Sequence, residues 1–170
     1  MDKVPDSATI MLIPDNAYKA ARPRTKDHHL TVAHFGRASE LTPSGIARLR
    51  DTVSTLARFA GGPIDALANG IGAFNAGRDG IAVVDLIDGI GTFRVRSRIE
   101  NLFGDARMGY SLDNVRVNYK HGFTPHITRE YLDREDDFYG EITPDLIDDF
   151  EFKFIAVGLW HGDQRYEVSL

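Results

Sequence analysis

The chain has 170 residues, a formal net charge of −5, 42% hydrophobic residues and no cysteine. This length predicts a single domain spanning residues 1–170, and the composition is typical of a globular protein with its own core. The absence of cysteine excludes disulfides, thiolate nucleophiles and cysteine zinc sites. The negative charge argues against long duplex DNA as a partner, because binding it requires many Lys and Arg contacts to phosphates.

The first part of the chain predicts two strands. Residues 8–13 form a short apolar run closed by Pro14-Asp15, which is typical of a buried strand. Residues 22–26 are polar and basic and predict a loop. Residues 30–35 are rich in strand formers and stop at Gly36.

The next segment predicts an amphipathic helix. Thr42-Pro43 marks its start, with Thr42 as N-cap and proline in the first turn, and Gly61-Gly62 marks its end. The apolar residues between them recur at spacings of three, four and three: Ile46, Leu49, Val53 and Leu56.

The remainder predicts strands around one more helix. Extended stretches at 64–74 and 81–87 flank a turn, and a helix is expected over 92–103 and ends at Gly104. Its expected apolar face consists of Phe93, Ile99, Leu102 and Phe103. The segment through Tyr119 favours no element, and further strands are expected at 123–131, 150–160 and 164–170. This order predicts an α+β fold with antiparallel sheets.

One short motif occurs twice. His29-Leu30-Thr31 and His126-Ile127-Thr128 both read His-aliphatic-Thr, both fall in expected strands, and they lie 126 − 29 = 97 positions apart. Residues i and i+2 of a strand point to the same face, so each motif presents an imidazole beside a hydroxyl. If the two strands are neighbours, both pairs face one cleft.

That set of groups is sufficient for phosphoryl chemistry. An unperturbed imidazole titrates near pH 6.5, so one copy can act as general base and the other as general acid. Threonine hydroxyls can donate hydrogen bonds to the non-bridging phosphate oxygens. No metal is required. RNA-type phosphodiesters suit such a site because their 2′-oxygen supplies an internal nucleophile or a strained cyclic phosphate.

Other interpretations exist for these histidines. A lone His-x-Thr in a strand is more often structural, whereas two matching copies favour a site. His28, His29 and His34 could be imagined as a metal cluster, but their spacing matches no recognised ligand pattern. We therefore expect no metal. His34 is expected on the strand face opposite His29.

The two motifs carry a family resemblance. The segments His29–Gly36 and Phe123–Thr128 resemble the two signatures of the two-histidine (2H) phosphoesterases, the 2′-5′ RNA ligase-like family, and Gly162–Val168 resembles its terminal strand. Two residues depart from the family pattern. His34 stands where an aromatic residue is usual, and Arg129 stands where an aliphatic residue is usual.

The resemblance implies a bilobal fold with pseudo-two-fold symmetry, a central cleft between antiparallel sheets, and helices packed outside. It implies a metal-independent phosphodiesterase, with no cofactor, that hydrolyses 2′,3′-cyclic or short or cyclic oligonucleotide phosphodiesters. His29 and His126 would be catalytic, and Thr31 and Thr128 would bind phosphate. Two alternatives remain open: a phage-type nuclease that degrades cyclic oligonucleotide messengers of antiviral defence, and a non-catalytic RNA- or nucleotide-binding module.

Residues near the motifs are further candidates for substrate binding. Cationic and imidazole side chains can contact phosphate, and aromatic rings can stack on bases. The candidates are Lys120, His121, Arg129, Phe35, Tyr131 and Trp160. The expected partner is a nucleotide or short oligonucleotide. Because no apolar run approaches about 20 residues and no signal pattern precedes residue 8, we expect a cytoplasmic monomer with no membrane partner.

Overall fold

The structure is a computed structural model that describes residues 6–22, 27–75, 80–103, 123–132 and 149–170. Its strands are β1 (Ala8–Pro14), β2 (Leu30–His34), β3 (Ile64–Asn75), β4 (Ile81–Asp88), β5 (His126–Leu132), β6 (Phe150–His161) and β7 (Gln164–Ser169). Its helices are α1 (Asn16–Ala21), the short 3-10 helix η1 (Ala38–Glu40), α2 (Pro43–Ala60) and α3 (Ile90–Leu102). The α+β class expected from the sequence is confirmed.

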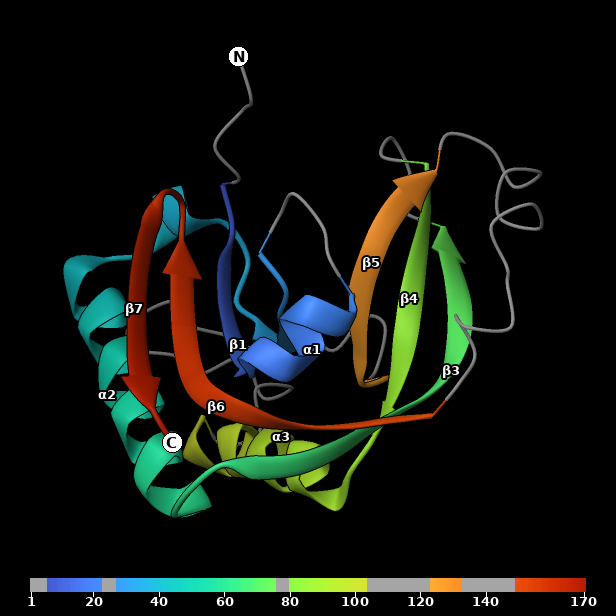
Figure 1. Ribbon diagram of the computed structural model, residues 1–170. Coiled ribbons are helices and arrows are strands. Elements are labelled where there is room, and N and C mark those ends of the chain that lie inside the picture. Colours follow the sequence, from blue (N-terminus) through green and yellow to red (C-terminus); the bar gives the residue numbers. More distant parts are fainter. Residues whose placement is uncertain (1–5, 23–26, 76–79, 104–122, 133–148) are drawn as a thin grey trace.

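The seven strands of the described residues belong to one antiparallel sheet in the order β1-β2-β5-β4-β3-β6-β7. A further pairing of β1 with β6 closes six of them into a ring, and β7 adds to the outside of β6. Figure 1 shows two lobes, with β1 and β7 on one side and β3, β4 and β5 on the other. The long strand β6 runs beneath and joins both lobes (Figure 1). The ring brings β2 and β5, which carry the two motifs, next to each other.

Helix α2 forms as its sequence predicts. Thr42 caps its N-terminus, because its Oγ1 accepts a hydrogen bond from the Gly45 backbone N–H at 3.0 Å. Gly61 ends the helix with a φ of 69°, a left-handed conformation that glycine adopts without steric cost. The buried residues Leu49, Val53 and Leu56 face the sheet and join the core.

The apolar face expected for the second helix is partly wrong. Phe93 is 48% exposed, whereas Val95 and Ile99 are buried in the core. Val95 and Ile99 are four residues apart and so lie on one side of α3, and Phe93 is rotated away from them. Phe93 instead contacts Phe123 edge-on, with ring centroids 5.5 Å apart. Gly104, the expected end of this helix, lies outside the described residues.

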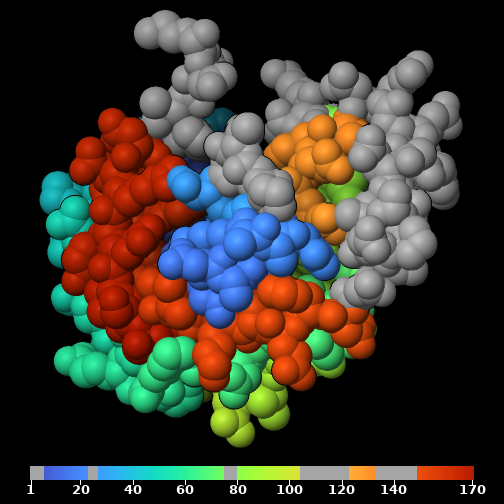
Figure 2. Space-filling view, viewed as in Figure 1, coloured from blue at the N-terminus to red at the C-terminus, as the bar shows by residue number. Residues whose placement is uncertain are grey.

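Helix α1 was not expected from the sequence. It has six residues, and Tyr18 is its one buried side chain, so it offers no apolar repeat to recognise. Asp15 caps it by accepting a hydrogen bond from the Tyr18 backbone N–H at 2.9 Å. Figure 2 shows α1, in blue, packed between β6 and β5 on the front of the molecule. Its position makes Tyr18 part of the core.

The sheet has two faces that matter for the site. The core face carries Leu12, Leu30 and Ile127, each fully buried and part of one hydrophobic cluster. We call the opposite face, which carries Thr31 and Thr128, the motif face. None of the helices in the described part of the chain is long and apolar enough to cross a membrane.

Candidate active site

The centres of the two motifs lie directly opposite each other. Leu30 of β2 pairs with Ile127 of β5 across antiparallel strands. Both side chains are fully buried on the core face, so the flanking His and Thr residues of both motifs turn to the motif face. The four flanking residues are half-buried: His29, Thr31, His126 and Thr128.

This register sets out the four side chains as corners of a square. His29 lies opposite Thr128, and Thr31 lies opposite His126, at the roughly 5 Å Cβ spacing of cross-strand neighbours. The two histidines therefore occupy one diagonal, about 7–8 Å apart. The two threonines occupy the other diagonal. We call these four residues the motif square.

A β-bulge follows each motif at the same position. The strand register skips Val32 in β2 and Arg129 in β5, in each case three residues after the motif histidine. A bulge shifts the residues that follow it by one, so side chains beyond it change face. His34 and Tyr131 consequently lie on the motif face. The expectation that His34 lies on the face opposite His29 is wrong, because simple alternation does not account for the bulge.

Each motif histidine is oriented by a backbone carbonyl two residues before it. Nδ1 of His29 lies 3.2 Å from the Asp27 carbonyl oxygen, and Nδ1 of His126 lies 2.7 Å from the Thr124 carbonyl oxygen. A carbonyl only accepts, so Nδ1 must carry the proton in both rings. Nε2 is then the atom of each ring that can exchange a proton with a substrate.

Each motif histidine also contacts an aromatic ring. His29 contacts Trp160, with ring centroids 4.7 Å apart, and His126 contacts Phe74 edge-on at 4.8 Å. Trp160 was a candidate from the sequence, but Phe74 was not. Phe74 lies two residues after Gly72 in β3, and Trp160 lies two residues after Gly158 in β6. The two aromatic residues thus occupy matching positions in the two strands, which only the fold reveals.

His34 adds a third imidazole to the motif face. Its Nδ1 lies 3.2 Å from the Thr9 hydroxyl of the neighbouring strand β1. Burial lowers the pKa of His34 below its ordinary value, because a partly desolvated ring disfavours the charged form. The neutral form of His34 is thus favoured, at the position where the family pattern has an aromatic residue.

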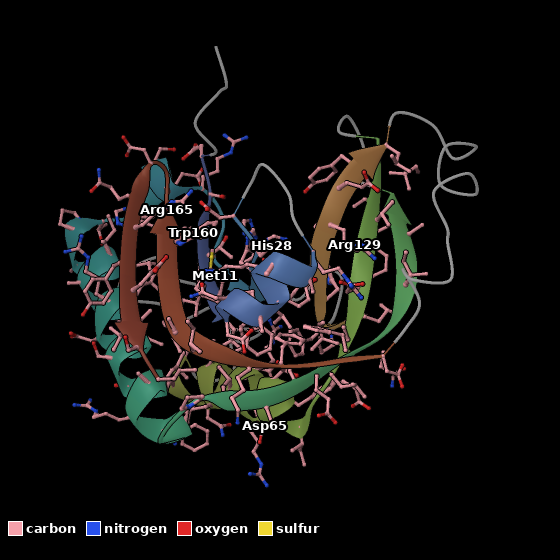
Figure 3. The ribbon with its side chains drawn as sticks, viewed as in Figure 1. Met11, His28, Asp65, Arg129, Trp160 and Arg165 are labelled. Atoms are coloured by element: carbon pink, nitrogen blue, oxygen red, sulfur yellow. The ribbon has the colours of Figure 1, made fainter. Side chains whose placement is uncertain are left out.

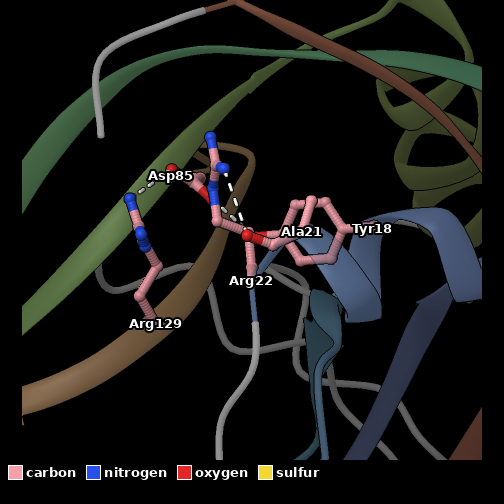
Figure 4. Close-up of polar contacts among 5 residues, drawn as sticks. All are labelled: Tyr18, Ala21, Arg22, Asp85 and Arg129. Carbon is pink, nitrogen blue, oxygen red and sulfur yellow. Dashed lines mark hydrogen bonds and ion pairs between the residues drawn. The ribbon is translucent and has the colours of Figure 1, made fainter. Parts of the chain in front are cut away.

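Two candidate substrate-binding residues lie elsewhere. Phe35 is buried in the core and its ring packs 5.2 Å from that of Phe103, so it cannot stack on a base. Arg129 is the bulge residue of β5 and reaches back to Asp85, with Nη1 3.5 Å from the carboxylate. Asp85 is almost fully buried, and Figure 4 shows Arg22 and Arg129 on either side of it. This contact directs the Arg129 guanidinium toward Asp85, and its role toward a phosphate stays a prediction.

The other candidates for substrate binding remain predictions. Tyr131 is 46% exposed on the motif face. Trp160 contacts His29 and also lies under the guanidinium of Arg165, so a base would have to displace that arginine (Figure 3). Lys120 and His121 lie outside the described residues.

The metal cluster imagined for three histidines does not form in the described part of the chain. There, no group of three or more His, Asp or Glu side chains is placed to hold a metal ion. His28 points to the core instead, where its ring meets Tyr18 edge-on at 5.4 Å.

A hollow of about 800 Å³ is lined by Asp15, Asp65, Ala66, Leu67, Asp88, Gly89, Glu151, Phe152 and Lys153. No residue of the motif square lines it. Its lining is largely acidic, with Lys153 paired to Asp65 at 2.6 Å, and this charge is unsuited to a phosphate ligand. The expected central cleft at the motif square stays a prediction.

Known structures share this arrangement of strands and helices. TT0787 of Thermus thermophilus aligns over 96% of this chain and 94% of its own, with a TM-score of 0.57 and 16% identity. E. coli LigT complexed with 3′-AMP aligns over 98% of this chain and 95% of its own, with a TM-score of 0.51 and 13% identity. The chain has the LigT-like fold. No protein-family model and no curated protein matches the sequence.

The LigT-like fold agrees with the resemblance that the motifs carry. The fold likeness extends over nearly the whole chain, whereas the sequence resemblance rests on three short segments. At these identities the likeness establishes the fold alone.

Proposed function

We propose that this protein is a metal-independent phosphodiesterase that hydrolyses 2′,3′-cyclic or short or cyclic oligonucleotide phosphodiesters. The observation that carries the proposal is the motif square, in which Leu30 opposite Ile127 sets two His-Thr pairs on one face. A nucleotide substrate is supported by the complex of E. coli LigT with 3′-AMP. Opening a 2′,3′-cyclic phosphate gives a 2′- or 3′-phosphate of this kind.

The diagonal placement of the histidines suits in-line displacement. A phosphate at the centre of the square would have one Nε2 beside the attacking water and the other beside the leaving ribose oxygen. The neutral imidazole takes a proton from the water as its oxygen bonds to phosphorus. The protonated imidazole gives a proton to the ribose oxygen as the P–O bond breaks. The threonine hydroxyls donate hydrogen bonds to the non-bridging oxygens from the other diagonal.

The test is a substrate panel with matched variants. The parent is assayed with 2′,3′-cyclic mononucleotides and with cyclic di- and trinucleotides, with and without EDTA. We expect turnover that EDTA leaves unchanged. His29→Ala and His126→Ala should each lower kcat by about 10²–10⁴-fold, because each removes one proton-transfer group. The double variant should lose little more than the worse single variant, because the two groups act as a unit.

His161→Gln is the control, since this half-buried histidine belongs to neither motif. It should keep parental turnover. Activity abolished by EDTA, or equal losses in the control, would contradict the proposal. Nucleotide binding without turnover of any phosphodiester in the panel would identify a binding module instead.

A further inference from the structure

A closed chain of contacts surrounds His29. Its Nδ1–H donates to the Asp27 carbonyl, and the Asp27 carboxylate forms an ion pair with Arg165. The Arg165 guanidinium carbon lies 3.9 Å from the centre of the Trp160 ring, and that ring contacts His29 in turn. Figure 3 shows Trp160 and Arg165 next to each other on β6 and β7. We call Asp27, Trp160 and Arg165 the His29 clamp.

The β6–β7 hairpin aligns two members of the clamp. Trp160 and Arg165 are directly opposite in the strand register, so their side chains leave the sheet on the same face. Glu167 fixes the indole, because its carboxylate accepts a hydrogen bond from Trp160 Nε1 at 3.3 Å. Gly158 leaves room for the Glu167 side chain, since a Cβ there would lie 3.3 Å from Glu167 Cγ. The indole and guanidinium are therefore held in place independently of His29.

His126 has a different surround. Thr124 stands where Asp27 stands, two residues before the histidine, and Phe74 takes the place of Trp160. Threonine carries no charge, so residue 124 cannot form the ion pair that Asp27 forms. The two halves share the carbonyl bond and the aromatic contact, but the charged part of the clamp belongs to His29.

The ion pair between Asp27 and Arg165 contributes little to the stability of the fold. Asp27 and Arg165 are 61% and 50% exposed, and exposed pairs contribute little to the stability of a fold. Its geometric effect is larger, because it ties the backbone that orients His29 to the β6–β7 hairpin. His29 itself precedes the first residue of β2, so its carbonyl partner Asp27 lies outside the hydrogen-bonded strand.

We propose that Asp27, Trp160 and Arg165 are positioning residues that hold the His29 imidazole in its Nδ1–H form with Nε2 directed to the motif face. The kinetic part of this proposal rests on the proposed phosphodiesterase function. Small displacements of a proton-transfer group slow the chemical step more than they weaken binding. The clamp therefore acts on kcat through the position of His29.

The first experiment compares matched charge variants. Asp27→Asn keeps the backbone carbonyl and removes the ion pair, and Arg165→Gln removes its partner. Asp65→Asn is the control, because it breaks the exposed Asp65–Lys153 pair at a distance from Trp160 (Figure 3). We expect both clamp variants to lower kcat about tenfold with less than about a twofold change in KM, and the control to match the parent.

The second experiment measures the tautomer of the His29 imidazole and requires no substrate turnover. Nitrogen-15 NMR of the imidazoles reports which ring nitrogen carries the proton. The parent should show His29 as the Nδ1–H tautomer, and both clamp variants should show a mixture of tautomers. Trp160 is the one tryptophan of the chain, so its fluorescence, which a protonated imidazole quenches, follows His29 through a pH titration. His29→Gln should remove that pH-dependent quenching.

A conservative replacement separates positioning from mere folding. Trp160→Phe introduces the residue type that Phe74 supplies to His126, and it should keep most of the parental kcat, whereas Trp160→Ala should not. Clamp variants with the parental tautomer and kcat would overturn the positioning role. A parent that hydrolyses no substrate would overturn the proposed function alone, because the NMR result still decides whether the clamp orients His29.

Discussion

At the residue scale, the two halves of the site match more closely than their sequences suggest. Each motif histidine has a carbonyl acceptor two residues earlier and an aromatic neighbour, although Trp160 and Phe74 lie in strands without obvious sequence similarity. The bulges add His34 and Tyr131 to the same face. His34 and Tyr131 each lie five residues after a motif histidine. They differ in that an imidazole titrates below neutral pH and a phenol does not.

The titration of His34 predicts a loss of stability in acid. Burial lowers its folded-state pKa, so its contribution to stability is present above the unfolded value near 6.5 and is lost as the pH falls through the lower folded value. His34→Gln keeps a hydrogen-bonding partner for Thr9 and cannot titrate. Its melting temperature should therefore fall less than that of the parent between pH 7 and pH 5. Parallel curves would contradict this prediction.

At the scale of elements, caps and hairpins set where the chain begins and ends its regular structure. Helix α2 runs between a threonine N-cap and a left-handed glycine, and both were readable from the sequence. The β6–β7 hairpin turns at Gly162, whose φ of 59° again suits glycine, and this turn fixes the register of Trp160 with Arg165. The turn at Gly162 thus sets the positions of Trp160 and Arg165, which are distant in sequence from His29.

Removing the α2 cap should destabilise the protein by a predictable amount. Thr42→Ala leaves the Gly45 N–H without its side-chain acceptor, and we expect the free energy of unfolding to fall by about 1 kcal/mol. Thr55→Ala within the same helix is the control and should be neutral or slightly stabilising, because alanine is the better helix former. Urea denaturation measures both. Equal losses in the two variants would argue against the capping role.

At the scale of the whole molecule, a buried polar cluster joins α1 to the lobe that contains β3, β4 and β5. The Tyr18 hydroxyl donates to Asp85 of β4 at 2.6 Å, and Arg22 and Arg129 also contact that carboxylate (Figure 4). Asp85 pairs with Ile127 of the second motif, and Leu12 of β1 pairs with Leu30 of the first motif. The position equivalent to Asp85 in the lobe that contains β1 is therefore the apolar Leu12. One buried carboxylate therefore holds together three segments that are distant in sequence.

The Tyr18–Asp85 bond predicts sensitivity to alkali. Burial and the Asp85 charge raise the pKa of the Tyr18 phenol, so its contribution to stability is complete below the unfolded value near 10 and is lost as the pH rises above it. Tyr18→Phe should lower the free energy of unfolding by about 1.5–3 kcal/mol at pH 7, because the bond joins a charged partner. Its stability should also vary less than that of the parent between pH 9 and pH 11.

The comparison for Tyr18→Phe is Tyr166→Phe. Tyr166 bonds the neutral Ser54 hydroxyl at 3.2 Å, so its loss should cost only about 0.5–1.5 kcal/mol. Denaturant unfolding across the pH range measures both variants. Equal costs would mean that the Asp85 charge contributes nothing special to the cluster.

The sequence by itself determined the local features of this protein. The two His-x-Thr motifs, the caps of α2 and most strands are properties of neighbouring residues, and they sufficed to predict the fold class. Helix α1 was not predicted, because a single buried residue, Tyr18, produces no periodic pattern of apolar residues.

Only the tertiary structure decided which side chains share a face. The pairing of Leu30 with Ile127, the bulges at Val32 and Arg129, and the contact of Phe74 with His126 all depend on hydrogen bonds between strands far apart in the chain. A bulge reverses the alternation of side chains wherever the neighbouring strand imposes it. Counting along one strand therefore misplaced His34, while its true position follows from the register with β1.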